Sequence, residues 1–307
     1  MSELTRSRWV KLARSIEVSN SISNPWALVE IRFLRRTRRV RFQNGFEVVG
    51  TPANFPMVES LVRLAYHGAV FAPPGGSGLV TWQVDCDQCE VTTPNGIRLT
   101  LKESDPSILA ETFLYDMHFQ GFDLTGKVIV DIGAYVGDSA LYFASKGAMV
   151  IAYEPDPSNF RTLLYNLRLN PALQERIVPV NAAAGRDGTV TFHTGLGGGS
   201  RIYASTSEAV EVRSVSLRTL LHDHSLTKPF LLKSDCKGGE FDLVSQDEIR
   251  AFHRIAIEYS ADLRGTEVTP LFKALVDRGF DRIRIYKPNW ASFPLSSVGM
   301  IRAEKGE

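Results

Sequence analysis

The chain has 307 residues, of which 44% are hydrophobic, and its formal net charge at pH 7 is +1. These values are typical of a globular protein with one large domain or a core plus an appendage, and they give no global signature of nucleic-acid binding. Because the sequence has neither an N-terminal apolar leader nor an apolar run long enough to span a bilayer, it predicts a cytoplasmic protein.

The first hundred residues predict an α+β extension, with a domain boundary between residues 104 and 105. Hydrophobic periodicity and turn residues predict helices over 4–16, 29–36 and 57–67, a turn-rich segment over 72–78, and a helix over 107–119. A hairpin is expected from strands 83–93 and 97–103, because Asn95-Gly96 favours a tight turn between them.

Positive charge is concentrated near the start of the chain. Residues 1–50 contain ten Lys or Arg and four Asp or Glu, a net charge of +6, and six of these arginines lie between Arg32 and Arg41. Such a cluster can contact anionic lipid or RNA. The sequence favours a solvated face, because basic and apolar residues are interleaved. We therefore expect no nucleic-acid partner, and we leave open a peripheral membrane contact through this cluster and the formation of an oligomer.

From residue 126 onward, strand and helix patterns alternate, as a parallel sheet requires. The expected strands cover 127–132, 149–153, 177–181, 230–234 and 254–259, with an added hairpin over 189–193 and 210–215 and an antiparallel pair over 281–286 and 298–303. The glycine-rich segment 195–200 is expected to form a mobile loop, and 287–294 is expected to line an acceptor pocket or pack on the sheet edge.

The most informative motif begins with the strand over 128–132. It carries Asp131 and leads into Gly133-Ala134-Tyr135-Val136-Gly137, and the next strand ends at Glu154-Pro155. A dinucleotide loop needs a glycine where Tyr135 stands, because the pyrophosphate lies against the backbone there, and Asp131 would repel that pyrophosphate. S-adenosylmethionine has an ammonium and a sulfonium but no phosphate. The loop therefore predicts S-adenosylmethionine as the cofactor.

These residues resemble the FkbM-type class I methyltransferases. The resemblance rests on residues 130–137, 152–157, 180–192, 215–221, 231–240 and 257–259, and it extends over roughly residues 105–303. It implies a Rossmann-like α/β domain over 105–307, with seven strands of which the last is antiparallel. It also implies O-methylation of a hydroxyl on a sugar, glycan or other small-molecule acceptor. The family pattern K-x-D-x-E-G-x-E departs here at one position, where Lys237 replaces the first glutamate.

Candidate donor-binding residues follow from the order of the strands. Asp131 and the loop backbone are expected to face the methionine end of the donor, Glu154 to bind its ribose hydroxyls, and residues after the third strand to flank its adenine. The expected cofactor-binding residues are Asp131, Gly133, Ala134, Tyr135, Gly137, Glu154, Pro155, Asn181 and Ala182.

Candidate acceptor residues lie at the end of the fourth predicted strand. A hydroxyl needs a base or a metal to become nucleophilic. Asp235 is expected to act as the base or to orient the substrate, with Lys233 on the same strand face. Glu240 is expected to bind acceptor hydroxyls or to begin a helix, and Glu258 is a further candidate base or metal ligand.

No metal site is assigned from the sequence. Cys86 and Cys89 form a lone C-x-x-C without a second pair of ligands nearby, so we interpret them as ordinary thiols. Two other functions remain open. One is a non-catalytic module that binds the donor or docks a partner, and the other is an NAD-linked oxidoreductase, which Tyr135 and Asp131 disfavour.

Overall fold

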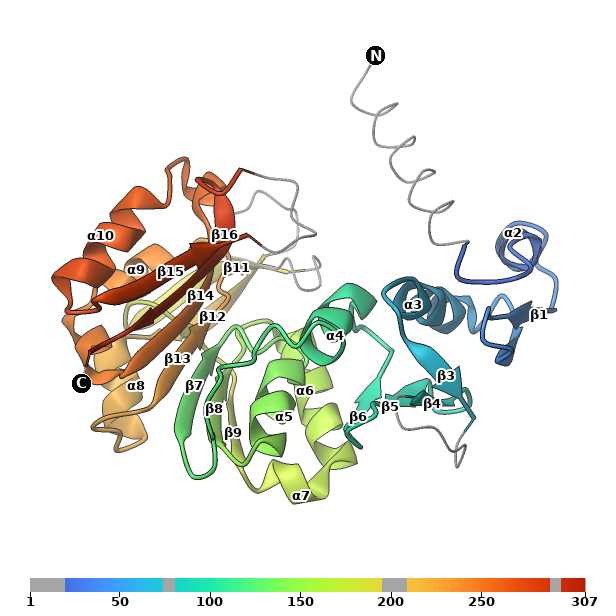
Figure 1. Cartoon of the computed structure of the whole chain (residues 1–307), viewed down its shortest axis with the longest axis horizontal. Helices are drawn as coiled ribbons and strands as arrows, with labels where there is room; N and C mark the ends of the chain where they lie inside the picture. Colours follow the sequence, from blue (N-terminus) through green and yellow to red (C-terminus); the bar gives the residue numbers. More distant parts are fainter. Residues whose placement is uncertain (1–19, 74–80, 195–208, 288–293, 307) are drawn as a thin grey trace, which may run out of the picture. The chain divides into compact units, whose positions relative to one another are not determined.

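The structure, a computed structural model, describes residues 20–73, 81–194, 209–287 and 294–306. The contacts divide the chain into two compact units, the first ending at Phe119 and the second beginning at Gln120 (Figure 1). The boundary expected between residues 104 and 105 stays a prediction. The helix expected over 4–16, the loop over 195–200 and most of the segments 72–78 and 287–294 lie outside the described residues.

The first unit combines short helices with two small sheets, and it contains elements that the sequence did not predict, such as β2 and β3. Its helices are α2 (Trp26–Arg32), α3 (Phe55–Tyr66) and α4 (Pro106–Phe113), and its strands are β1 (Arg38–Arg41), β2 (Glu47–Gly50), β3 (Val70–Ala72), β4 (Thr81–Asp85), β5 (Glu90–Thr92) and β6 (Arg98–Thr100). Strands β1 and β2 pair with each other, and the second sheet has the order β3-β4-β5-β6. The hairpin expected around Asn95-Gly96 is confirmed as β5 and β6.

Three predicted elements of this unit are corrected. The helix expected over 29–36 begins at Trp26 and ends at Arg32, and Arg35 has a left-handed φ of +55°. The strand expected over 83–93 is two antiparallel strands, because the chain reverses at Asp85–Cys89. In this turn Asp85 Oδ1 accepts hydrogen bonds from the backbone amides of Asp87 and Gln88, and Cys89 has a φ of +59°. The helix expected over 107–119 ends at Phe113. A left-handed residue, Asp116, stops it, and Met117 N–H bonds back to Glu111 C=O in a helix-terminating turn.

The second unit is built on a seven-stranded mixed sheet. In spatial order its strands are β15 (Arg282–Tyr286), β16 (Val298–Glu304), β14 (Arg254–Ser260), β13 (Leu231–Ser234), β7 (Val128–Ile132), β8 (Met149–Tyr153) and β9 (Ile177–Val180). Only β16 runs antiparallel to its neighbours. This order is that of the class I methyltransferase sheet, and the predicted fold class is confirmed.

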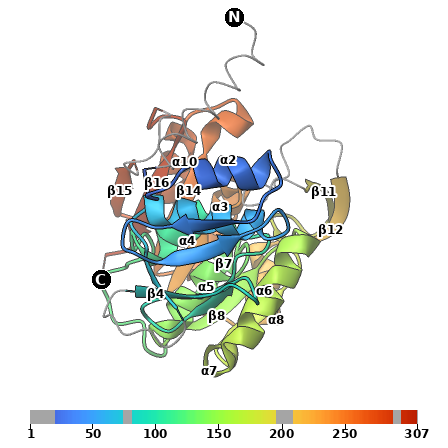
Figure 2. The same cartoon turned by 90° about the vertical axis from the view of Figure 1, so that its right-hand side faces the viewer.

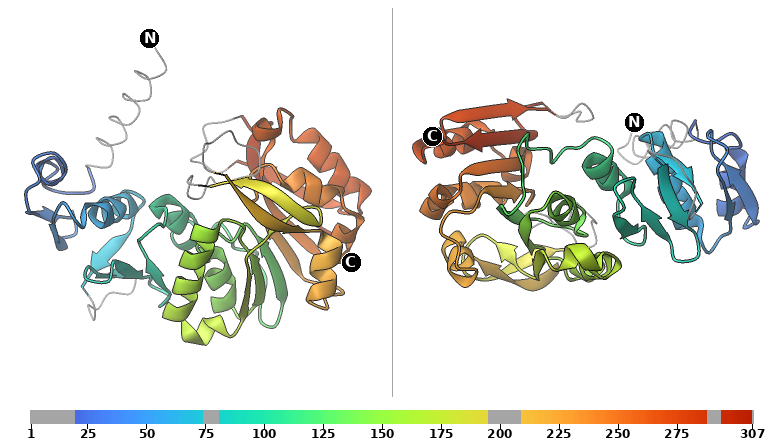
Figure 3. Two further views of the ribbon diagram at one scale, coloured as in Figure 1. Left: turned by 180° about the vertical axis from the view of Figure 1, so that it is seen from behind. Right: turned by 60° about the horizontal axis from the view of Figure 1, so that its bottom comes forward.

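Helices cover both faces of this sheet (Figures 1 and 3). One face carries α5 (Asp138–Ser145), α6 (Pro157–Leu169) and α7 (Pro171–Gln174), and the other carries α8 (Leu217–Asp223), α9 (Glu240–Ser245) and α10 (Thr269–Asp277). The helix starts are set by local capping. Asp156 accepts a hydrogen bond from Ser158 N–H at 2.8 Å ahead of α6, and Ser216 accepts one from Thr219 N–H at 3.1 Å ahead of α8.

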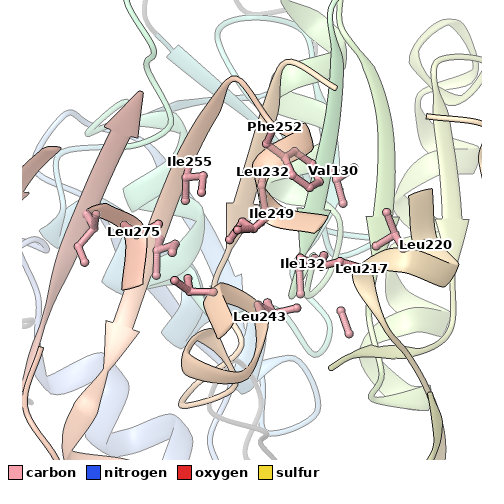
Figure 4. Close-up of a cluster of buried hydrophobic side chains, with 14 of the residues drawn as sticks. Val130, Ile132, Leu217, Leu220, Leu232, Leu243, Ile249, Phe252, Ile255 and Leu275 are labelled. Atoms are coloured by element: carbon pink, nitrogen blue, oxygen red, sulfur yellow. The ribbon is translucent and has the colours of Figure 1, made fainter. Parts of the chain in front are cut away.

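The core on the α8–α10 face is apolar and closely packed. Side chains from the strands, such as Val130 and Leu232, meet Leu220, Leu243 and Leu275 from the helices (Figure 4). This burial holds the parallel strands in one register, so that β7, β8, β9, β13 and β14 all end at the same edge of the sheet. The predicted site residues lie at that edge.

A small accessory sheet follows β9. It has the order β10-β12-β11, formed by β10 (Ala183–Ala184), β12 (Ala209–Val215) and β11 (Gly188–His193). The added hairpin that the sequence predicts is confirmed as the antiparallel pair of β11 and β12. No described helix has both the length and the apolar character needed to cross a membrane.

Candidate functional site

The loop after β7 lies directly against the end of β13. Gly133 has a φ of +77°, and a Cβ built on it would lie 2.1 Å from the carbonyl oxygen of Asp235. The Gly133 and Ala134 amides both donate to the Tyr153 carbonyl, at 2.9 and 3.0 Å. Only glycine permits this approach, so the glycine brings the expected donor loop and the expected acceptor acid together.

Glu154 holds the next part of the same loop. Tyr135, with a φ of +49°, donates its backbone N–H to Glu154 Oε2 at 2.8 Å, and Asp156 N–H donates to Glu154 Oε1 at 2.9 Å. Asn159 on α6 reaches Oε1 at 3.4 Å. The carboxyl group is 4% exposed, and burial raises its pKa to about 8 despite these hydrogen bonds.

Asp131 and Lys233 form a buried ion pair beneath the loop. Lys233 Nζ lies 2.8 Å from Asp131 Oδ1 and donates to the Gly133 carbonyl at 2.9 Å, while Ser139 on α5 donates to Asp131 Oδ2 at 2.6 Å. Burial opposes the charged form of Lys233, but the Asp131 carboxylate outweighs this effect and raises the pKa of the lysine. Lys233 therefore anchors the loop after β7 from the neighbouring strand.

Lys237 bridges two carboxylates at the carboxyl ends of β13 and β14. Its ammonium lies 2.8 Å from Asp235 Oδ1 and 2.9 Å from Glu258 Oε1. Burial opposes the charge on Lys237, but Asp235 and Glu258 raise its pKa well above the ordinary value. Burial, together with the charge of Asp235, raises the pKa of Glu258. The side chains of Asp235, Lys237 and Glu258 are 27, 20 and 15% exposed, so this group is partly open to solvent.

Glu240 lies deeper than its neighbours. It is the first residue of α9, is fully buried, and accepts a hydrogen bond from Gly238 N–H at 2.7 Å. Burial raises its pKa to about 8. Of the two roles expected from the sequence, the start of a helix agrees with its place as the first residue of α9, and a role toward the acceptor stays a prediction.

The residues expected near the adenine divide into two environments. Asn181 is exposed at the end of β9, and its side-chain amide donates to the carbonyls of Glu154 at 2.8 Å and Pro155 at 3.2 Å. Ala182 is fully buried and belongs to the hydrophobic core. Asn181 therefore ties the end of β9 to the end of β8, beside the Glu154 carboxyl group.

The structure thus brings most of the predicted residues to one edge and adds contacts that the sequence did not indicate. Ser139, which supports Asp131, was missed, and Asn159 was expected to help cap its helix but not to contact Glu154. Their only sequence signal is that each lies in the first turn of the helix after its strand. Among the described residues, no group of three or more His, Cys, Asp or Glu is placed to hold a metal ion. Cys86 and Cys89 are free thiols in the turn before β5.

A family model described as the Methyltransferase FkbM domain matches residues 131–282. The match runs from the acid at the end of β7 to the first residue of β15, and it includes every candidate site residue. The chain carries an FkbM methyltransferase domain.

Solved structures similar to this chain are also methyltransferases. Precorrin-6y C5,15-methyltransferase from Geobacter metallireducens GS-15 has 16% identity over 66% of this chain and 89% of that chain, with a TM-score of 0.38. The N-terminal domain of human METTL16 in complex with SAH has 12% identity over 92% and 95%, with a TM-score of 0.41. A ribosomal protein L11 methylase from Lactobacillus delbrueckii subsp. bulgaricus has 14% identity over 64% and 78%, with a TM-score of 0.38. No curated protein matches the chain.

The cofactor of the FkbM domain is S-adenosylmethionine, and the residues at the sheet edge fit it. Acidic side chains outnumber basic ones there, because Asp131, Asp235 and Glu258 share two lysines, and the buried Glu154 carboxyl adds no positive charge. The edge therefore suits a cationic donor better than a diphosphate. Gly133 keeps the loop free of a side chain where it meets Asp235.

Proposed function

We propose that the FkbM domain transfers a methyl group from S-adenosylmethionine to a hydroxyl of a sugar, glycan or other small-molecule acceptor. The observation that carries the proposal is the contact between Gly133 and Asp235. It puts the donor loop and a partly exposed carboxylate at adjoining strand ends, as an in-line transfer between two bound molecules requires.

The donor is assigned to the loop and the two strands beside it. When bound, S-adenosylmethionine supplies an electrophilic methyl group on a good leaving group. In this proposal, Glu154 accepts hydrogen bonds from the ribose hydroxyls, and Asn181, followed by Ala182, borders the adenine. The backbone of Gly133, Ala134, Tyr135 and Gly137, held from below by Asp131 and Lys233, shapes the pocket for the methionine end.

Asp235 is proposed as the general base. Lys237 pairs with Asp235 Oδ1 at 2.8 Å, which fixes the carboxylate, and we assign Oδ2 to the acceptor hydroxyl. A carboxylate in this position removes the hydroxyl proton as the oxygen attacks the methyl group. Glu258 shares the Lys237 ammonium and borders the same space.

The test is Asp235→Asn. We expect affinity for S-adenosylhomocysteine to stay within about twofold, because Asp235 does not belong to the donor loop. We expect methyl transfer to fall by about 10²–10⁴-fold, as loss of a general base does. Transfer is measured as S-adenosylhomocysteine formed with a panel of sugars and glycans. Asp262→Asn, which changes an exposed carboxylate, is the matched control and is expected to have no effect. Full turnover by Asp235→Asn would rule out Asp235 as the base.

A second function is favoured by one specific observation. The proposed base is already ion-paired with Lys237, and the same ammonium holds Glu258. An edge whose carboxylates are neutralised in this way also suits a module that binds the donor without transferring its methyl group. Donor binding without transfer to any acceptor in the panel would support this function over the enzyme.

A further inference from the structure

Helix α2 presents an exposed apolar face. Trp26 and Val29 of this helix are 75 and 38% exposed, and Phe33 and Leu34, which follow its last residue, are 69 and 56% exposed. Trp26, Val29 and Phe33 follow the i, i+3, i+7 spacing, so they lie on one side of the helix. Exposed large apolar residues are normal when scattered, but a contiguous group of aromatic side chains indicates a contact surface.

The opposite face of α2 is anchored. Ala27 and Ile31 are 4 and 0% exposed, and they bury that side of the helix within the first unit. Glu30 fixes the helix to β1 through Arg38, whose Nε and Nη2 donate to the two carboxylate oxygens at 2.6 and 2.7 Å. The exposed side chains are therefore held outward by packing on the other side. Figure 2 shows α2, in blue, within this unit.

Arginines are frequent in the segment that contains these apolar residues, and Arg32 lies over the ring of Phe33. The segment 26–47 contains six arginines and two glutamates, a net charge of +4. Both glutamates are already paired within the segment, Glu30 with Arg36 and Arg38, and Glu47 with Arg39 at 3.1 Å and Arg41 at 2.7 Å. We call the apolar face together with the arginines of 32–41 the Trp26 surface.

We propose that the Trp26 surface docks on an anionic lipid bilayer. Tryptophan and phenylalanine partition into the interface between headgroups and acyl chains, and neighbouring arginines are attracted to anionic headgroups. The net positive charge of the surface disfavours a second copy of the chain as the occupant, because two such faces repel each other. The aliphatic Val29 and Leu34 fit acyl chains better than the stacked bases of a nucleic acid.

The experiment is vesicle flotation of the full chain. One set of vesicles contains phosphatidylcholine alone, and the other contains phosphatidylcholine with roughly 30% phosphatidylserine. This fraction of phosphatidylserine gives the vesicle a strongly negative surface. We expect binding only to the phosphatidylserine vesicles, and we expect it to weaken as salt rises from about 0.1 to 0.5 M, because salt screens the headgroup charge.

Two surface variants separate the apolar and the electrostatic contributions. Trp26→Ser with Phe33→Ser is expected to weaken vesicle binding by about tenfold or more. Arg32→Gln with Arg35→Gln and Arg36→Gln is expected to weaken it by about a hundredfold, at about 1 kcal/mol per basic residue. These residues are exposed, so both variants should keep the melting temperature and the S-adenosylhomocysteine affinity of the parent chain.

Matched controls change exposed residues of the second unit. Phe272→Ser removes an aromatic side chain from α10, and Arg161→Gln with Arg168→Gln and Arg186→Gln removes three exposed positive charges. Both controls are expected to bind vesicles like the parent. The proposal fails if the parent does not float with phosphatidylserine, or if the surface variants float as well as the parent. It also fails if these variants instead abolish dimer formation in light scattering or binding to a single-stranded RNA probe.

Discussion

At the scale of single residues, Glu154 holds the loop after β7, and we propose that it also binds the donor. Its carboxylate receives the backbone amides of Tyr135 and Asp156, so it shapes the donor loop before any ligand binds. We also assign to it the ribose hydroxyls of the donor. A substitution that removes both functions should lower donor affinity more than one that keeps part of the hydrogen bonding.

For Glu154→Ala, we expect donor affinity to fall by roughly 1–3 kcal/mol, because the ribose hydroxyls and the loop amides lose their hydrogen-bond acceptor. Glu154→Gln keeps one carbonyl acceptor and should give a smaller loss. Calorimetric titration with S-adenosylhomocysteine measures both. An alanine variant with unchanged affinity would remove Glu154 from the donor site.

Glu240 gives a prediction about pH. Its pKa is about 8 in the folded chain, against 4.5 for the ordinary group, so the folded state keeps a proton that the unfolded state has lost. The free energy of unfolding therefore falls as pH rises between these two values. Stability should be greater at pH 6 than at pH 9.

Glu240→Gln removes this titration and keeps an acceptor for Gly238 N–H. Between pH 6 and pH 9, the free energy of unfolding of the variant should fall by about 2 kcal/mol less than that of the parent. Urea unfolding at the two pH values measures the difference. Glu267→Gln, at an exposed position, should follow the parent. Parallel pH dependence in parent and Glu240→Gln would mean that Glu240 ionises normally in the folded chain.

At the scale of elements, the site depends on where neighbouring strands end. The sequence was sufficient to predict the strands, their order along the chain and the acids that follow them, because β-branched apolar runs mark buried parallel strands. Parallel strands end at one edge, so the sequence predicts that Asp131, Glu154 and Asp235 lie close together.

Other contacts at this edge depend on pairing between distant segments. Lys237 contacts Glu258, 21 positions later, only because β13 and β14 are neighbours, and no local pattern indicates such a bridge. The reversal at Asp85–Cys89 was missed for a different reason. The strands on both sides have similar propensities, and the turn depends on a left-handed cysteine where the sequence offers no glycine.

The contact between two strand ends can be tested at Gly133. Gly133→Ala places a Cβ 2.1 Å from the Asp235 carbonyl in a left-handed residue, so it should force β7 and β13 apart at the site. Gly265→Ala has a similar φ, +62°, with nothing within 4 Å of its Cβ, and should cost only the backbone strain of about 1–2 kcal/mol.

We expect Gly133→Ala to lower the free energy of unfolding by about 2 kcal/mol more than the Gly265→Ala control, through overpacking. It should also abolish binding of S-adenosylhomocysteine. Urea unfolding and calorimetry measure the two effects. Equal stability of the two variants would show that the loop and the end of β13 are not in contact.

At the scale of the whole molecule, the two units carry different chemistry. The second holds several acidic side chains at its sheet edge, and the first has exposed arginines and aromatic side chains between residues 26 and 41. The net charge of +1 hides a local excess of positive charge at the start of the first unit, because residues 1–50 carry +6 and the remainder of the chain carries −5. Changes to one unit should therefore leave the binding function of the other intact.

The most direct test of the account is calorimetric titration of the full chain with S-adenosylhomocysteine, run beside NAD⁺. The account predicts micromolar binding of S-adenosylhomocysteine and no heat with NAD⁺, because Tyr135 stands where a dinucleotide loop needs a glycine beside the pyrophosphate. Binding of NAD⁺, or no binding of S-adenosylhomocysteine by a folded chain, would contradict it.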